Sequence, residues 1–209
     1  MSHEITKREQ LSEPEMRLDE RDRTDMQRLV AGHDAALNDL MERHAGKLLN
    51  YLIRCLQNEE DAADVTQETF VRVYQNRSKF HLSERFSTWL YAIATNLIKD
   101  RYRYRTRHPQ VSLDAENEST GGSLQKNLPE EGPSPGEALD AHERAAAVRR
   151  AVASLPEELR APLVLSEYEE LSHVEIAAIL KCSAKAVEMR VYRARQHLRT
   201  VLSSLLEIQ

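Results

Sequence analysis

The segment from Lys181 to Arg199 has the composition of a surface that binds nucleic-acid phosphates. It holds six basic residues and one acidic residue, Glu188, so its net charge is +5. Cations neutralise backbone phosphates, and basic, amide and aromatic side chains can contact base edges in the major groove. The alternative is a solvated amphipathic helix whose cations pair with acids on neighbouring helices. If the segment is helical, the side chains that we expect to contact DNA are Lys185, Met189, Arg190, Tyr192, Arg193 and Gln196.

A second candidate surface lies in the segment that follows Phe86. From Lys99 to His108, five bases and one acid give a charge of +4. Aromatic side chains interleaved with cations are suited to stacking on unpaired bases along a neutralised backbone. A core explains the apolar stripe that contains Trp89, but not the tyrosines on the opposite side, which we predict to be exposed. That polar side carries Tyr91, Thr95, Asn96, Lys99, Tyr102 and Arg103.

The helix expected over residues 60–76 has an acidic outer face. The helix dipole stabilises carboxylates in a first turn, which is enough to explain Asp61 and Asp64 alone. Paired carboxylates can also act as acid and base, but no His, Ser or metal-ligand partner accompanies them at a suitable spacing. An acidic strip around an apolar residue is typical of a protein-docking face. We define this acidic strip as Asp61, Asp64, Gln67, Glu68 and Val71.

Helices must position these surfaces, and the pattern of the chain predicts an all-α fold. Apolar residues recur at spacings of three and four, and no segment shows sustained strand alternation. Ser172 and Glu175 form a capping box and Ser183 is a candidate N-cap, so the last two helices have the outline of a helix-turn-helix. We predict helices over residues 25–31, 34–56, 60–76, 86–104, 140–154, 157–168, 173–180 and 184–202.

Composition divides these helices into two small helical domains. Residues 109–143 hold eight acids against one base, Lys126, for a charge of −7, and most of the prolines and glycines of the chain. Such a composition is typical of a flexible linker. We therefore predict a disordered tail over 1–24, a helical domain over 25–108, a flexible acidic linker over 109–139, and a helix-turn-helix domain over 140–205.

Charge and composition narrow the class of protein. The 209 residues carry a net charge of −5, which alone argues against nucleic acid, but this value averages strongly basic and strongly acidic segments. No run of about 18 apolar residues and no signal-peptide pattern is present, so we expect a cytoplasmic protein without a membrane span. Cys55 and Cys182 suit a reducing compartment and form no zinc pattern, so we expect no metal and no cofactor.

Three segments together resemble the signatures of bacterial RNA polymerase sigma factors of the extracytoplasmic function (ECF) group, in the sigma-70 family. They are residues 61–70 (DAADVTQETF), residues 86–96 (FSTWLYAIATN) and residues 155–177, which begin with LPEELR and end with LSHVEIA. They occur in the order that the family has, and the combination is far more specific than a single helix-turn-helix.

The resemblance implies a protein that is not an enzyme and that binds core RNA polymerase. Asp64, Gln67 and Glu68 match the family pattern that docks on the largest polymerase subunit, and Asp61 and Val71 extend that surface. Promoter DNA is the second implied partner. The third is an anti-sigma factor that masks both surfaces and so places the chain under the control of stress or envelope signals.

The resemblance also divides the DNA contacts between two promoter elements. The helix over 184–199 matches the reader of the minus-35 element. The loop over 76–86 and the polar face around Asn96 match the region that captures an extruded base of the minus-10 element and opens the duplex. The implied minus-10 contacts are Lys79, Phe80, Arg85, Tyr91, Thr95, Asn96, Lys99, Tyr102 and Arg103.

Two positions depart from the family pattern, and one other class of protein remains as an alternative to a sigma factor. Lys181 stands where the family often has Gly and Glu188 where it often has a base, which bears on the preferred minus-35 sequence. The alternative is a stand-alone helix-turn-helix regulator that does not bind polymerase. That alternative explains residues 172–199, but it leaves the acidic strip and the aromatic-basic surface without a role.

Overall fold

The computed structural model describes residues 13–107 and 135–206, which form helices joined by short connections, with no strand among them. The N-terminal lobe contains α2 (Glu13–Val30), α3 (Ala36–Leu56), α4 (Glu59–Gln75), a 3-10 turn (Arg77–Lys79) and α5 (Phe86–Arg107). The C-terminal lobe contains α6 (Pro135–Ala153), α7 (Glu157–Glu167), α8 (His173–Leu180) and α9 (Ala184–Leu206). The all-α prediction with two helical regions is therefore confirmed.

Local signals in the sequence set several helix boundaries. α3 ends at Gln57, whose φ of 57° is left-handed, and the Asn58 side chain then accepts a hydrogen bond from the Asp61 amide at 2.8 Å to start α4. The predicted capping box is present, because Ser172 and Glu175 bond each other's backbone amides. Ser183 caps α9 by accepting from the Ala186 amide at 3.1 Å.

The predicted disordered tail over residues 1–24 is wrong for its second half. α2 begins at Glu13 and buries Met26 and Leu29 completely. Tertiary polar contacts hold it: Asp22 forms an ion pair with Arg43 Nε at 3.0 Å and a hydrogen bond with His44 Nε2 at 2.8 Å. Residues 1–12 lie outside the described residues, as do residues 109–134 of the predicted acidic linker. Residues 135–139, predicted as the end of that linker, form the start of α6.

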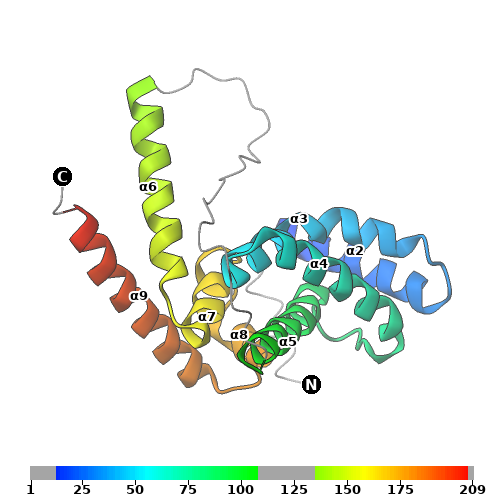
Figure 1. The fold of residues 1–209 in the computed structure, drawn as a ribbon. Helices are drawn as coiled ribbons and strands as arrows, with labels where there is room; N and C mark the ends of the chain where they lie inside the picture. Colours follow the sequence, from blue (N-terminus) through cyan, green and yellow to red (C-terminus); the bar gives the residue numbers. More distant parts are fainter. Residues whose placement is uncertain (1–12, 108–134, 207–209) are drawn as a thin grey trace.

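The two lobes pack against each other. α8 lies against α5, and α7 lies against α3 (Figure 1). One buried apolar cluster runs through both lobes and includes Tyr51 and Ile98 from the first and Leu165 and Ile179 from the second. α6 and α9 extend from this body and diverge toward their far ends (Figure 1). No helix among the described residues is long and apolar enough to cross a membrane.

Candidate nucleic-acid interface

α8, the turn at Lys181 and α9 form the predicted helix-turn-helix. Lys181 adopts φ 54°, a left-handed conformation that ends α8, so a lysine fills a turn position that favours glycine. In α9, Val187, Val191 and Ala194 are buried against the rest of the lobe. Their spacing of four and three residues places them on one face of the helix.

The opposite face of α9 is exposed, as DNA contact requires. Met189 is 39% exposed and Tyr192 is 55% exposed, and Lys185, Arg193 and Gln196 are exposed beside them, while Arg190 is half-buried. The Gln196 amide donates to the Tyr192 hydroxyl at 2.7 Å, which orients the two side chains together. All six predicted minus-35 contacts thus lie on one helix, five of them exposed.

Part of the positive charge on α9 is paired with acids, as the amphipathic-helix alternative expects. Lys185 contacts Glu188 at 2.9 Å, and Arg195 contacts Glu167 at 2.6 Å. Both pairs are exposed, and such pairs contribute about 0–1 kcal/mol, so a DNA phosphate can replace the carboxylate at little cost. Arg193 has no ion pair with any residue that the structure describes. The paired cations therefore remain available to DNA.

The acidic strip lies along the outer face of α4. Asp64, Gln67, Glu68 and Val71 are exposed, with Val71 46% accessible, whereas Asp61 is half-buried. Arg101 and Arg105 of α5 pair with Asp61, and Arg101 also approaches Asp64 at 3.8 Å. Arg72 pairs with Glu68 at 2.9 Å. The strip therefore combines carboxylates, an amide and one exposed apolar side chain, with arginines paired to its carboxylates.

The predicted exposure of the polar face of α5 is wrong. Tyr91 is 5% exposed, Thr95 is 1% exposed, and Phe80 at the preceding loop is 8% exposed. The C-terminal lobe covers Tyr91, whose hydroxyl donates to Glu169 Oε2 at 2.5 Å. Thr95 is hydrogen-bonded within the N-terminal lobe, to Tyr51 and Tyr91. Phe80 is buried for a different reason, because its ring packs on Phe86 and Trp89 inside the N-terminal lobe.

A buried hydrogen-bond chain holds this covered face. The Thr95 hydroxyl donates to the Tyr91 carbonyl at 2.7 Å and lies 2.9 Å from the Tyr51 hydroxyl. Burial and then the Glu169 carboxylate raise the pKa of Tyr91 far above its ordinary value, so this phenol is a neutral donor. Burial likewise raises the pKa of Tyr102 to about 12, and its hydroxyl donates to the Cys55 carbonyl.

The remaining minus-10 candidates are half-buried or exposed. Arg85 forms an ion pair with Glu175 at 2.7 Å, while the Lys79 ammonium donates to Asn76 at 2.8 Å. Asn96 and Lys99 are half-buried and Arg103 is exposed. The structure therefore places the nine candidates on the loop before α5 and along α5, but it leaves only the peripheral ones open to solvent.

Residues at the seam between the lobes are the ones that sequence patterns missed. Arg54 of α3 lies over the Tyr168 ring at 4.2 Å, and Glu169 follows in the same loop. Arg160 of α7 donates to the carbonyls of Cys55 at 2.8 Å, and of Ala153 and Leu155 at 2.7 Å each. Among these residues only Arg160 is marked by a sequence motif, because it ends the LPEELR segment. The contacts of Arg54 with Tyr168 and of Tyr91 with Glu169 join positions more than 75 residues apart, and periodicity along one helix cannot reveal them.

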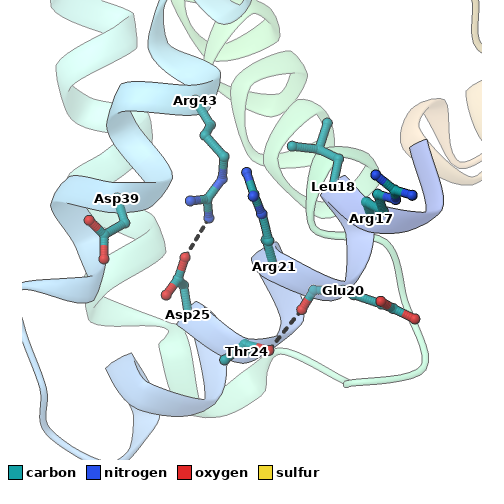
Figure 2. Close-up of a pocket in the computed structure, with 8 residues that line it drawn as sticks. All are labelled: Arg17, Leu18, Glu20, Arg21, Thr24, Asp25, Asp39 and Arg43. Carbon is teal, nitrogen blue, oxygen red and sulfur yellow. Dashed lines mark hydrogen bonds and ion pairs between the residues drawn. The ribbon is translucent and has the colours of Figure 1, made fainter. Parts of the chain in front are cut away.

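Two hollows lie near these surfaces. One, of about 500 Å³, opens at the seam between α5 and α7, with Lys99, Tyr102 and Arg190 in its wall. The other lies between α2 and α3, where three arginines (Arg17, Arg21 and Arg43) and three acids (Glu20, Asp25 and Asp39) are among the lining residues (Figure 2). Arg43 contacts Asp25 at 2.6 Å, which makes this second hollow part of the α2 attachment. Within the described ranges, no group of three His, Cys, Asp or Glu side chains is placed to hold a metal ion.

Comparison with known families assigns both lobes. Residues 40–108 match the model of sigma-70 region 2, and residues 145–198 match that of sigma-70 region 4. The chain is 35% identical to the ECF RNA polymerase sigma factor SigW of Bacillus subtilis, over 83% of this chain and 92% of that protein. The chain therefore belongs to the sigma-70 family of RNA polymerase sigma factors. Within that family it is a member of the ECF group.

A second relative and a solved structure agree with this assignment. The RNA polymerase sigma-H factor of Pseudomonas aeruginosa is 33% identical over 90% of this chain and 96% of that protein. CnrH, solved in complex with the cytosolic domain of CnrY, superposes with a TM-score of 0.61 and 27% identity, covering 88% of this chain and 98% of CnrH. The family assignment disfavours the stand-alone regulator.

Proposed function

We propose that this chain binds core RNA polymerase and directs it to promoters by reading minus-35 and minus-10 elements. The acidic strip on α4 docks the polymerase, α9 reads the minus-35 element, and the face of α5 with its preceding loop takes the minus-10 strand. One observation carries the proposal. The same chain exposes both the acidic strip on α4 and the basic outer face of α9.

The proposal extends to the environment and control of the protein. It acts with polymerase in the cytoplasm and catalyses no reaction of its own. An anti-sigma factor is a further partner, supported by the solved complex of CnrH with the cytosolic domain of CnrY. The domain limits at residues 25–108 and 140–205 remain part of the proposal, with residues 13–24 of α2 added before the first.

Chain length allows both lobes to reach their elements. The names of the elements imply a separation of about 25 base pairs, or about 85 Å at ~3.4 Å per pair. The 27 residues between α5 and α6 span about 90 Å when fully extended. Simultaneous reading therefore requires the lobes to move apart from their arrangement in Figure 1.

The test combines polymerase binding with transcription. Gln67→Ala with Glu68→Lys removes two exposed side chains of the acidic strip, and we expect it to abolish co-purification with core polymerase and run-off transcription from genomic templates. A matched control, Gln27→Ala with Glu42→Lys, makes the same changes at exposed positions of α2 and α3 and should retain both activities. Equal behaviour of the two double variants contradicts the proposal.

A further inference from the structure

Glu188 is the one acidic residue within α9, the helix that the proposed function assigns to the minus-35 element. It lies about one turn after the start of the helix at Ala184, and its side chain is 51% exposed. A carboxylate repels the phosphates that the cations of α9 would contact. Any favourable contact between Glu188 and DNA must therefore be with hydrogen-bond donors on base edges.

Glu188 and Lys185 form one paired group on the surface of α9. The Lys185 ammonium donates to Glu188 Oε1 at 2.9 Å and to Oε2 at 3.0 Å, and both side chains are exposed. Residues three positions apart on a helix are neighbours, so the two tips meet at one place. In a helix-turn-helix, the N-terminal residues of the second helix contact base edges. The pair is therefore at the part of α9 that reads sequence.

The other ion pair of α9 is built differently. Arg195 lies two turns after Glu188, and its guanidinium contacts Glu167 of α7 at 2.6 Å. The carboxylate of that pair belongs to a neighbouring helix, whereas the carboxylate of Glu188 belongs to the reading helix itself. Glu167 is thus a matched comparison, because it is an exposed acid that pairs with α9 without lying on it.

Base pairs differ in what their major-groove edges offer to an ammonium beside a carboxylate. In a G·C pair, guanine presents two neighbouring acceptors, N7 and O6, and cytosine presents the N4 amino donor. In an A·T pair, thymine presents one acceptor, O4, beside a methyl group. Lys185 has three donors, so it can bond Glu188 with one and guanine with the other two, while Glu188 accepts from cytosine N4. Only the G·C pair uses all of these groups.

We propose that Lys185 and Glu188 act together to select one G·C pair within the minus-35 element. Lys185 donates to guanine N7 and O6, and Glu188 accepts from cytosine N4 while it orients the ammonium. The inference deepens the proposed function and rests on it. Glu188 then lowers the affinity of α9 for DNA of any sequence and raises its selectivity at one position.

The test measures base preference with holoenzyme assembled from core polymerase and the full chain. A promoter mapped by run-off transcription of genomic DNA is rebuilt as a library with a randomised minus-35 region, and a barcode in each transcript identifies its template. The variants are Glu188→Ala and Glu188→Gln. The control, Glu167→Gln, removes the exposed partner of Arg195 and leaves the pair of Lys185 with Glu188 intact.

We expect the wild type to prefer G·C at one position by about tenfold, which is the discrimination of one good two-bond contact. Glu188→Ala should reduce this preference to about threefold, because Lys185 still contacts guanine. Glu188→Gln should raise A·T to the level of G·C there, because an amide accepts from adenine N6 and donates to N7. Glu167→Gln should keep the wild-type preference at every position.

A carboxylate that acts only through its charge gives a different result. Its removal strengthens transcription from all templates alike and leaves the order of preferred bases unchanged. That outcome in both Glu188 variants overturns the inference, while transcription by the wild-type holoenzyme leaves the proposed function standing. A wild-type holoenzyme that transcribes no template rejects the proposed function, and the assignment of Lys185 and Glu188 with it.

Discussion

Arg160 offers a sharp test of how the two lobes are held together. Its guanidinium donates to the Cys55 carbonyl in the N-terminal lobe and to the Ala153 and Leu155 carbonyls in its own lobe, all at 2.7 to 2.8 Å. Arg160→Ala removes all three bonds at once and leaves the carbonyls in a site that is 9% exposed at the arginine.

The size of the effect follows from opposing contributions. A hydrogen bond from a charged donor contributes about 1.5–3 kcal/mol, so three bonds set an upper range of about 5–9 kcal/mol. Removal of the guanidinium also recovers its desolvation cost, and water that enters the vacated space can bond some of the carbonyls. The Arg160 Nε is already buried without a partner among the described residues, which adds to the recovered cost. We therefore expect a net loss of about 3–5 kcal/mol.

Guanidinium-chloride unfolding followed by far-UV circular dichroism measures this loss. Arg160→Lys keeps the charge but presents a single ammonium to three carbonyls, so its loss should be intermediate. Arg193→Ala, at an exposed arginine of α9, should change stability by less than about 0.5 kcal/mol. A loss below about 1 kcal/mol for Arg160→Ala would refute the reasoning, because it would mean that the three bonds contribute almost nothing.

Two further predictions concern titratable groups. Burial opposes ionisation of Glu175, but hydrogen bonds from Ser172 and Arg85 outweigh it and hold its pKa below the ordinary 4.5. The stabilisation that ionised Glu175 gives is therefore complete above pH 4.5 and is lost as the pH falls through the lowered pKa. Glu175→Gln should reduce the free energy of unfolding by about 1–2 kcal/mol at pH 7 and by less near pH 3. A reduction that does not depend on pH contradicts this prediction. Burial raises the pKa of the Cys55 thiol to about 12, so Ellman's reagent should label the partly exposed Cys182 in the folded chain and Cys55 only after denaturation. Labelling of both thiols in the native chain contradicts this.

Periodicity and capping predicted the parts of the molecule that depend on neighbours within one helix. The inner face of α9 at Val187, Val191 and Ala194 followed from apolar spacing, because a helix that packs on one side shows its contact side in its own sequence. The exposed side of α4 followed in the same way. Ser172 and Glu175 set the start of α8 through hydrogen bonds between residues three positions apart. The Ser-x-x-Glu spacing that predicts these bonds is present in the sequence itself.

Contacts between distant segments were beyond such reasoning. Residues 13–24 alternate acids and bases, and what makes them an ordered helix is the pairing of Asp22 with Arg43 and His44, about twenty residues away. α5 has a polar side and an apolar side, and the polar side was predicted to face solvent. A hydroxyl such as that of Tyr91 can equally meet a carboxylate from another lobe, and the pattern along one helix does not distinguish the two.

The attachment of α2 means that the family boundary and the folding boundary differ. The region 2 match begins at residue 40, yet Arg23 of α2 donates to the Leu82 carbonyl at 2.9 Å and so braces the loop that leads into α5. A fragment that begins at residue 40 would lack the fully buried Met26 and Leu29. It would also lack Asp22, so His44 would lose this hydrogen-bond partner. Truncation at the domain edge given by family comparison would thus yield a protein whose loop before α5 has lost its outer support.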